Sequence, residues 1–183
     1  MEIPNSYESR TLLPLGPLRL KIVELVHLLL KLNKTPIIEA LADTEIFSKV
    51  SDLVKQYPWN NFLQLKTISI YEEVLDTIDD KTRGVILKKS NIGQTILKLA
   101  SRTTYSHESN RTIRHGYMAL IIKLANLLQK HTDKPEVKEY IDALGDEWKS
   151  FVEGELKQSN ILNTRSLGGQ QPRSSQDDED ESN

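Results

Sequence analysis

The chain has 183 residues, of which 38% are hydrophobic and 27% charged, with a net charge of −2 and no cysteine. This length suits one domain or a short array of repeats, and the lack of cysteine excludes disulfides, thiolate metal sites and thiol nucleophiles. No apolar run reaches the ~20 residues of a membrane helix, and residues 1–169 are too nearly neutral for the basic face that nucleic acid requires.

Residues 1–13 are polar and lack the basic start and apolar stretch of a secretory signal, so we expect a flexible lead-in. We expect the protein in the cytoplasm, with the nucleus as a second location. Pro17 suits the first turn of a helix, and residues 18–32 follow without a breaker. The polar residues of this segment form one narrow stripe, which predicts an inner helix covered on more than one side. They are Lys21, Glu24, His27 and Lys31.

The next three helices have recognisable beginnings and ends. Thr35-Pro36 predicts the start of a short helix over 37–42, and Asp43 is the predicted cap of a helix over 45–56. Pro58 ends that helix. Asn60 or Asn61 then caps a long amphipathic helix that runs to about residue 78.

The second half of the chain repeats this arrangement. After a turn at 79–84 we expect two short helices over 85–87 and 92–100, and then a polar loop over 101–111. Residues 117–128 predict a second inner helix with a narrow polar stripe. A capping box of Asp133 and Glu136 predicts a helix as far as residue 144, and a last helical segment covers 148–156.

No segment shows the alternation of a strand, so the predicted class is all-α. The long helices begin near 17, 60 and 112, which is close to the ~40 to 47 residues of HEAT or armadillo units. We therefore predict a HEAT/armadillo-like stack, a partial superhelix, over 14–160. Residues 161–183 predict a disordered acidic tail, in which Ser174 and Ser175 each precede an acid by three residues and are candidate phosphorylation sites; a plain solubilising tail is the alternative.

Residues for catalysis are lacking, so we expect no enzyme, no cofactor and no metal site. His107-Glu108 begins like a zinc-binding HExxH motif, but Arg111 stands where the second ligand belongs. A basic group near the second inner helix could receive an acidic or phosphorylated segment, or form an ordinary solvated loop. It consists of Arg102, Arg111, Arg114, His115 and Lys123.

The segment YPWNNFL at 57–63 is the most distinctive part of the chain. Trp59 precedes a helix cap, but residue 64, where a hydrophobic staple would need an apolar side chain, is Gln64. Another group must therefore hold Trp59. Either the adjacent unit of the stack or a partner protein could do so.

Four ordered motifs resemble the later part of the helical domain of the SAPS family, the regulatory subunits associated with phosphatases of the protein phosphatase 6 class. They are PLG at 14–16 with RLK at 19–21, YPWNNFL at 57–63, RHGYM at 114–118 with LAN at 124–126, and WKSFV at 148–152. The resemblance covers about residues 14–160. It implies a non-catalytic helical domain that binds a Ser/Thr phosphatase catalytic subunit and directs it to substrates, with further scaffold subunits as additional partners.

By this resemblance, partner contacts are expected at two ridge ends, which consist of Trp59, Asn60, Asn61 and Phe62 and of Arg114, Tyr117 and Asn126. The family usually has His at the position of Gln64, and its earlier helices are missing here, so we expect either a fragment or a shortened member. A stack cut in this way exposes an apolar end that favours oligomerisation unless residues 1–13 cover it. The alternative function is a helical-repeat adaptor that has lost phosphatase binding.

Overall fold

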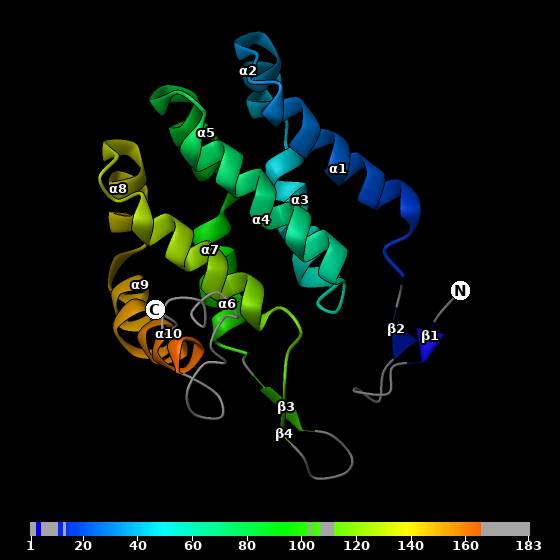
Figure 1. Cartoon of the computed structure of the whole chain (residues 1–183), viewed down its shortest axis with the longest axis vertical. Coiled ribbons are helices and arrows are strands. Elements are labelled where there is room, and N and C mark those ends of the chain that lie inside the picture. Colours follow the sequence, from blue (N-terminus) through cyan, green and yellow to red (C-terminus); the bar gives the residue numbers. More distant parts are fainter. Residues whose placement is uncertain (1–2, 5–10, 13, 103, 107–111, 166–183) are drawn as a thin grey trace, which may run out of the picture.

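The computed structural model describes residues 3–4, 11–12, 14–102, 104–106 and 112–165. Its helices form three successive units, in which a long helix, a short helix and a third helix follow one another (Figure 1). The long helices lie side by side in one row: α1 (Pro17–Lys31), α4 (Asn61–Asp76) and α7 (Met118–Lys130). The others are α2 (Thr35–Asp43), α3 (Ile46–Gln56), α5 (Asp80–Ser90), α6 (Ile92–Ala100), α8 (Pro135–Asp142) and α9 (Gly145–Phe151).

Equivalent helices of neighbouring units contact each other throughout. The row α1, α4 and α7, the row α2, α5 and α8 and the row α3, α6 and α9 are each in contact from one member to the next. After α9 the helix continues through a π-helical turn, η1 (Val152–Leu156), into α10 (Lys157–Thr164). The predicted all-α helical repeat stack is therefore confirmed.

Two short antiparallel ladders accompany the helices. β1 (Ile3–Pro4) pairs with β2 (Thr11–Leu12), and β3 (Thr104–Ser106) pairs with β4 (Thr112–Arg114). Strand β3 lies within the predicted loop over 101–111 and β4 directly follows it, so this ladder separates α6 from α7. It accounts for the wider spacing of the third long helix. Strands of two or three residues are too short to produce a recognisable alternation in the sequence.

Several helix ends differ from the prediction because other side chains do the capping. Helix α5 begins at Asp80, earlier than expected, because the Asp79 carboxylate accepts a hydrogen bond from the Thr82 amide at 3.0 Å, which also lowers the pKa of Asp79. Asp43 ends α2 and does not cap α3; the hydroxyl oxygen of Thr44 accepts from the Ile46 amide instead, at 3.2 Å.

The predicted capping box at Asp133 and Glu136 is wrong, because α8 starts with Pro135 and has no side-chain cap. The Glu136 carboxylate instead accepts a hydrogen bond from the Arg83 guanidinium. At the far end of the chain, α10 continues to Thr164, four residues beyond the boundary predicted at 160. Residues 166–183, with Ser174 and Ser175, lie outside the described residues, and the predicted tail with its phosphorylation sites stays a prediction.

The two predicted inner helices differ in burial. Helix α7 buries most of its apolar residues between its neighbours, as expected. In α1 only Val23, Val26 and Leu30 are buried, so its predicted cover on more than one side is wrong for this chain. The reason is its position, since α1 is the first long helix and has a long helix, α4, on one side only (Figure 1).

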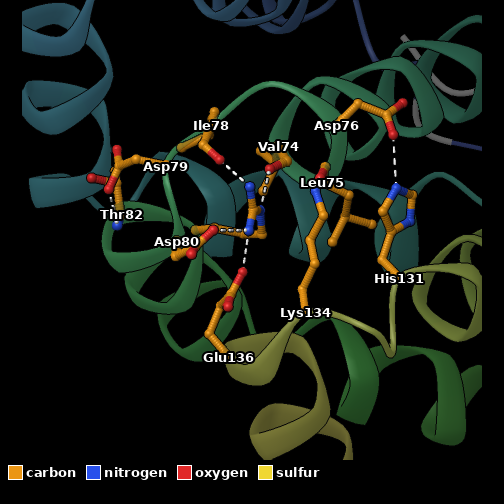
Figure 2. Close-up of polar contacts among 11 residues, drawn as sticks. Val74, Leu75, Asp76, Ile78, Asp79, Asp80, Thr82, His131, Lys134 and Glu136 are labelled. Atoms are coloured by element: carbon orange, nitrogen blue, oxygen red, sulfur yellow. Dashed lines mark hydrogen bonds and ion pairs between the residues drawn. The ribbon is translucent and has the colours of Figure 1, made fainter.

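Arg83 of α5 connects three elements from a buried position, with 3% of its surface exposed. Its Nε donates a hydrogen bond to the Val74 carbonyl at 3.1 Å, and its Nη2 donates to the Ile78 carbonyl. Its Nη1 contacts the carboxylates of Asp80, at 2.8 Å, and of Glu136 on α8 (Figure 2). One guanidinium thus closes the end of α4 and ties α5 to α8.

Two further side chains bind the same end of α4 from the turn between α7 and α8. Lys134 donates to the Leu75 carbonyl, and His131 Nε2 lies 2.7 Å from the Asp76 carboxylate (Figure 2). Positive groups are favourable at the negative end of a helix dipole. His131 Nδ1 lies 2.9 Å from the Leu127 carbonyl, so the ring is fixed at both nitrogens. The carboxyl end of α4 is therefore fastened to the third unit.

We expect Arg83→Met to lower the free energy of unfolding by about 3–5 kcal/mol, because it leaves the largely buried Glu136 carboxylate and two carbonyls without their donor. Lys88→Met is the matched control: it breaks the Lys88–Glu139 pair at 2.8 Å, whose side chains are 60% and 69% exposed, and it should leave the free energy of unfolding almost unchanged because water screens an exposed pair. Urea denaturation measures both. Equal, small losses would contradict the structural role of Arg83.

Candidate functional site

Trp59 is held by the neighbouring repeat unit, at Gly116. A Cβ atom placed on Gly116 would lie 2.6 Å from a ring carbon of Trp59 and 2.8 Å from the Pro58 carbonyl oxygen. Only a residue without a side chain fits so close to both groups. The turn before α4 and the turn before α7 are therefore packed against each other, which answers the question that Trp59 raised in the sequence.

The segment around Gly116 is itself fixed by its two aromatic neighbours. The rings of His115 and Tyr117 stack with their centroids 4.9 Å apart and their planes 10° from parallel. The buried Tyr117 donates a hydrogen bond from its hydroxyl to the Arg102 carbonyl at 2.7 Å. Tyr117, which was predicted as a partner contact, thus stabilises the segment that precedes α7.

The turn before α4 is held by side chains of the same motif. Asn60 caps α4, with its side-chain oxygen accepting from the Leu63 amide at 2.9 Å. The buried Gln64 donates from Nε2 to the Pro58 carbonyl at 2.7 Å. Gln64 therefore fixes the turn that carries Trp59.

A pocket of about 380 Å³ opens beside this turn, and we call it the Trp59 pocket. It lies between the segment that leads into α1 and the turn that joins α3 to α4. Its wall is largely apolar. The lining residues are Pro14, Leu15, Gly16, Pro17, Leu20, Gln56, Tyr57, Pro58, Trp59 and Asn60.

Exposed apolar side chains follow directly after the pocket. Phe62 is 71% exposed and Leu65, one turn further along α4, is 58% exposed, while Asn61 is also exposed. The chain folds with these side chains in water, so burial in the described fold does not explain them. The starts of α1, α4 and α7 lie along one edge of the molecule (Figure 1), and the Trp59 pocket lies on this edge.

Asn126 lies apart from this group. It is nine positions after Tyr117, roughly 13 Å further along α7 at the rise of a helix. Its side-chain amide exchanges two hydrogen bonds of 2.8 Å with that of Asn160 and so joins α7 to α10. It also lines a groove of about 260 Å³ between α4 and α7, together with Ile68, Glu72, Lys123, Leu127 and Lys130.

The sequence-predicted residues therefore do not form one site. Trp59, Asn60 and Tyr117 meet through Gly116, with Asn61 and Phe62 beside them, whereas Asn126 belongs to another surface. The backbone of Arg114 pairs with Thr104 in the β3–β4 ladder, and its side chain lies outside what the structure describes. Their role as partner contacts stays a prediction.

Sequence reasoning missed half of the Trp59 pocket. Leu20, Gln56 and the segment 14–17 line it, yet neither spacing nor residue type links these positions to Trp59. The PLG motif at 14–16 was the one available signal, and it did not indicate a neighbour more than 40 residues away.

The described parts of the chain show no group of three or more residues suited to hold a metal ion. Among these same residues no helix is long and apolar enough to cross a membrane. The arrangement at the Trp59 pocket offers apolar contact area and helix starts, which suit the binding of another protein.

The model of one protein family, described as SIT4 phosphatase-associated protein (SAPS), matches residues 2–165. The chain belongs to the SAPS family. Serine/threonine-protein phosphatase 6 regulatory subunit 3 of Gallus gallus is 26% identical over 177 residues, which is 84% of this chain and 20% of that protein. Serine/threonine-protein phosphatase 6 regulatory subunit 1 of Homo sapiens is 26% identical over 192 residues, 92% of this chain and 21% of that protein.

The match to a yeast relative covers a smaller share of this chain. SIT4-associating protein SAP190 of Saccharomyces cerevisiae is 28% identical over 109 residues, 57% of this chain and 10% of its own length. The chain thus spans about a fifth of the first two relatives and a tenth of the third. No solved structure matches the chain. As a SAPS family member, the chain is related to proteins named as phosphatase regulatory subunits.

We expect Gly116→Ala to destabilise the fold by about 1–3 kcal/mol, because the new methyl group pushes both Trp59 and the Pro58 carbonyl away from residue 116. Gly154→Ala is the matched control, since nothing lies within 4 Å of its Cβ position, and it should be neutral or stabilising by up to about 1 kcal/mol. Chemical denaturation followed by tryptophan fluorescence measures both. A Gly116→Ala protein as stable as wild type would show that the two turns are not in close contact.

Proposed function

We propose that this chain is a non-catalytic regulatory module that binds the catalytic subunit of a protein phosphatase 6-type Ser/Thr phosphatase and directs it to substrates. Membership of the SAPS family supports the regulatory role, because relatives in this family are named as regulatory subunits of protein phosphatase 6 and as SIT4-associating proteins. Additional scaffold subunits would bind the same assembly through other surfaces of the stack.

The observation that carries this proposal is the convergence of three family-like motifs on the Trp59 pocket. The PLG and YPWNNFL motifs line it, and the RHGYM motif holds Trp59 in place through Gly116. Structural packing explains the buried members of these motifs. It does not explain Phe62, which belongs to YPWNNFL and is 71% exposed.

The chemistry of this edge suits an apolar docking segment of the catalytic subunit. An aromatic side chain exposed beside an apolar pocket is typical of a binding hot spot, because both lose their water contact when a partner covers them. In this proposal an apolar side chain of the phosphatase fills the Trp59 pocket, and Phe62 with Leu65 packs against the surface around it.

The second candidate is a helical-repeat adaptor without phosphatase binding. The observation that favours it is length: the chain spans only about a fifth of the first two relatives. The phosphatase contact of those relatives can lie in the parts that this chain does not match.

We expect the purified chain to co-elute with a protein phosphatase 6-type catalytic subunit in size-exclusion chromatography with light scattering. Phe62→Asp should weaken the complex at least tenfold, because it places a charge in the apolar contact, and its exposure leaves folding unaffected. Leu162→Asp is the matched control: this residue of α10 is 51% exposed, and the substitution should leave binding unchanged.

Human protein phosphatase 6 regulatory subunit 1 is the positive control for an active catalytic subunit. If it binds and the wild-type chain does not, the regulatory proposal fails and the adaptor takes its place. If both bind and Phe62→Asp changes nothing, the chain is a phosphatase partner whose contact surface is not the edge at the Trp59 pocket.

A further inference from the structure

Helix α1 carries a continuous apolar stripe that faces water. Four apolar residues of α1 and the residue that directly follows the helix have 44–73% of their surface exposed. They are Leu18, Ile22, Leu25, Leu28 and Leu32. Single exposed leucines are common on protein surfaces, but five on one helix face form a contiguous patch, and such patches mark interaction sites.

The stripe lies on the flank of α1 that points away from the rest of the stack. His27 of α1 reaches towards α4, where its Nε2 lies 3.9 Å from the Glu73 carboxylate. At 100° per residue, Leu25 lies roughly 160° around the helix from His27. Figure 1 shows α4 on one side of α1 and no long helix on the other. The patch is thus oriented to receive another helix beside α1, as α4 receives α1.

The exposed positions are symmetric about Leu25. Ile22 and Leu28 lie three residues before and after it, and Leu18 and Leu32 lie seven before and after it. A two-fold axis at Leu25 therefore brings Ile22 of one copy level with Leu28 of the second copy, and Leu18 level with Leu32. Contacts between identical copies about a two-fold axis need this self-complementary order, which a contact with an unrelated protein does not require.

The charges around the stripe allow this pairing. Within α1, Lys21 is the charged residue nearest the seam, and the two-fold axis places it level with the half-buried Leu29 of the second copy. Its ammonium group is 2.7 Å from Glu24 of the same helix, so its charge is already balanced and its alkyl chain can cover Leu29. The axis also places Arg19 level with Lys31 of the second copy, but each lies about 120° around the helix from Leu25, so both point away from the seam.

The area is of the size that a dimer needs. The exposed fractions of the five residues add up to nearly three whole aliphatic side chains in each copy. Specific interfaces bury on the order of 1,000 Å² or more in total. Two such stripes, with the chains of Lys21 and Leu29 beside them, approach this size.

We propose that this chain forms a two-fold symmetric dimer through the outward flank of α1, with the two α1 helices antiparallel and Leu25 at the axis. The inference is independent of phosphatase binding, because the stripe lies on the first helix and uses none of the residues that line the Trp59 pocket.

Light scattering on the 183-residue chain tests the proposal, and the expected result is a dimer at micromolar concentration. Leu25→Lys should raise the dissociation constant at least tenfold, because it places two positive charges together at the axis. Leu162→Lys is the matched control, since Leu162 is 51% exposed against 53% for Leu25, and it should remain dimeric. Circular dichroism checks that both variants keep the helical content of wild type.

A charge-reversal pair gives a positive test. Leu25→Lys and Leu25→Glu should each be monomeric alone and should form a mixed dimer when combined, because opposite charges then meet at the axis. Since the chain contains no cysteine, Leu25→Cys supplies a single thiol, which should form an intermolecular disulfide on oxidation. Leu162→Cys should do so much less.

A wild-type chain that is monomeric at 100 µM overturns the proposal and leaves a different protein as the occupant of this flank. A dimer that Leu25→Lys does not weaken also overturns it, because the contact then lies elsewhere. A mixed dimer of the two charge variants, together with efficient crosslinking of Leu25→Cys, establishes both the surface and the antiparallel two-fold arrangement.

Discussion

The close approach of Trp59 to Gly116 is the constraint on which the candidate site depends. It sets the distance between the turns that begin α4 and α7, so it fixes how the second and third units meet at the edge where the long helices start. The same turn, braced by Gln64 and Asn60, forms one wall of the Trp59 pocket. Packing between units and the shape of the pocket therefore have a common origin. Many residues of the YPWNNFL motif serve the fold and the site together, and Asn61 and Phe62 are the members that the fold leaves exposed.

At the opposite edge of the row, ion pairs and hydrogen bonds join the second and third units, whereas at the Trp59 edge the two units are joined by close packing. At the carboxyl end of α4 the side chains of Arg83, His131 and Lys134 contact carbonyl and carboxylate oxygens from three elements (Figure 2). These contacts join the second and third units on the side away from the Trp59 pocket. Both ends of α4 are thus held by contacts with the third unit, and a surface that is ordered before binding lowers the entropy cost of binding a partner. The first unit is different, since the outward flank of α1 remains open to water.

Most of the fold could be predicted from the sequence because helix starts, prolines and apolar spacing are local signals. The all-α class, the three long helices and the family resemblance all came from such signals. The capping box at Asp133 failed because Glu136 is used by Arg83, 53 residues earlier, and no local pattern shows a long-range ion pair. The open flank of α1 was foreseen in part: the family resemblance indicated an exposed apolar end, but residues 18–32 themselves predicted a covered inner helix. An apolar helix face looks the same in the sequence whether or not a neighbour covers it. In the candidate site, the lack of a staple partner at Gln64 correctly indicated that Trp59 is held from elsewhere, but the partner, Gly116, has no side chain and leaves no sign in the sequence.

In the proposed complex, the edge around the Trp59 pocket faces the phosphatase. Amide hydrogen exchange of the chain, with and without a protein phosphatase 6-type catalytic subunit, tests it most directly because it reports on every segment of the complex. If this edge faces the phosphatase, peptides covering 14–20 and 56–65 exchange more slowly in the complex, while peptides covering α8 are unchanged. Protection confined to α8 and the carboxyl end of α4, with no change at 56–65, would contradict it.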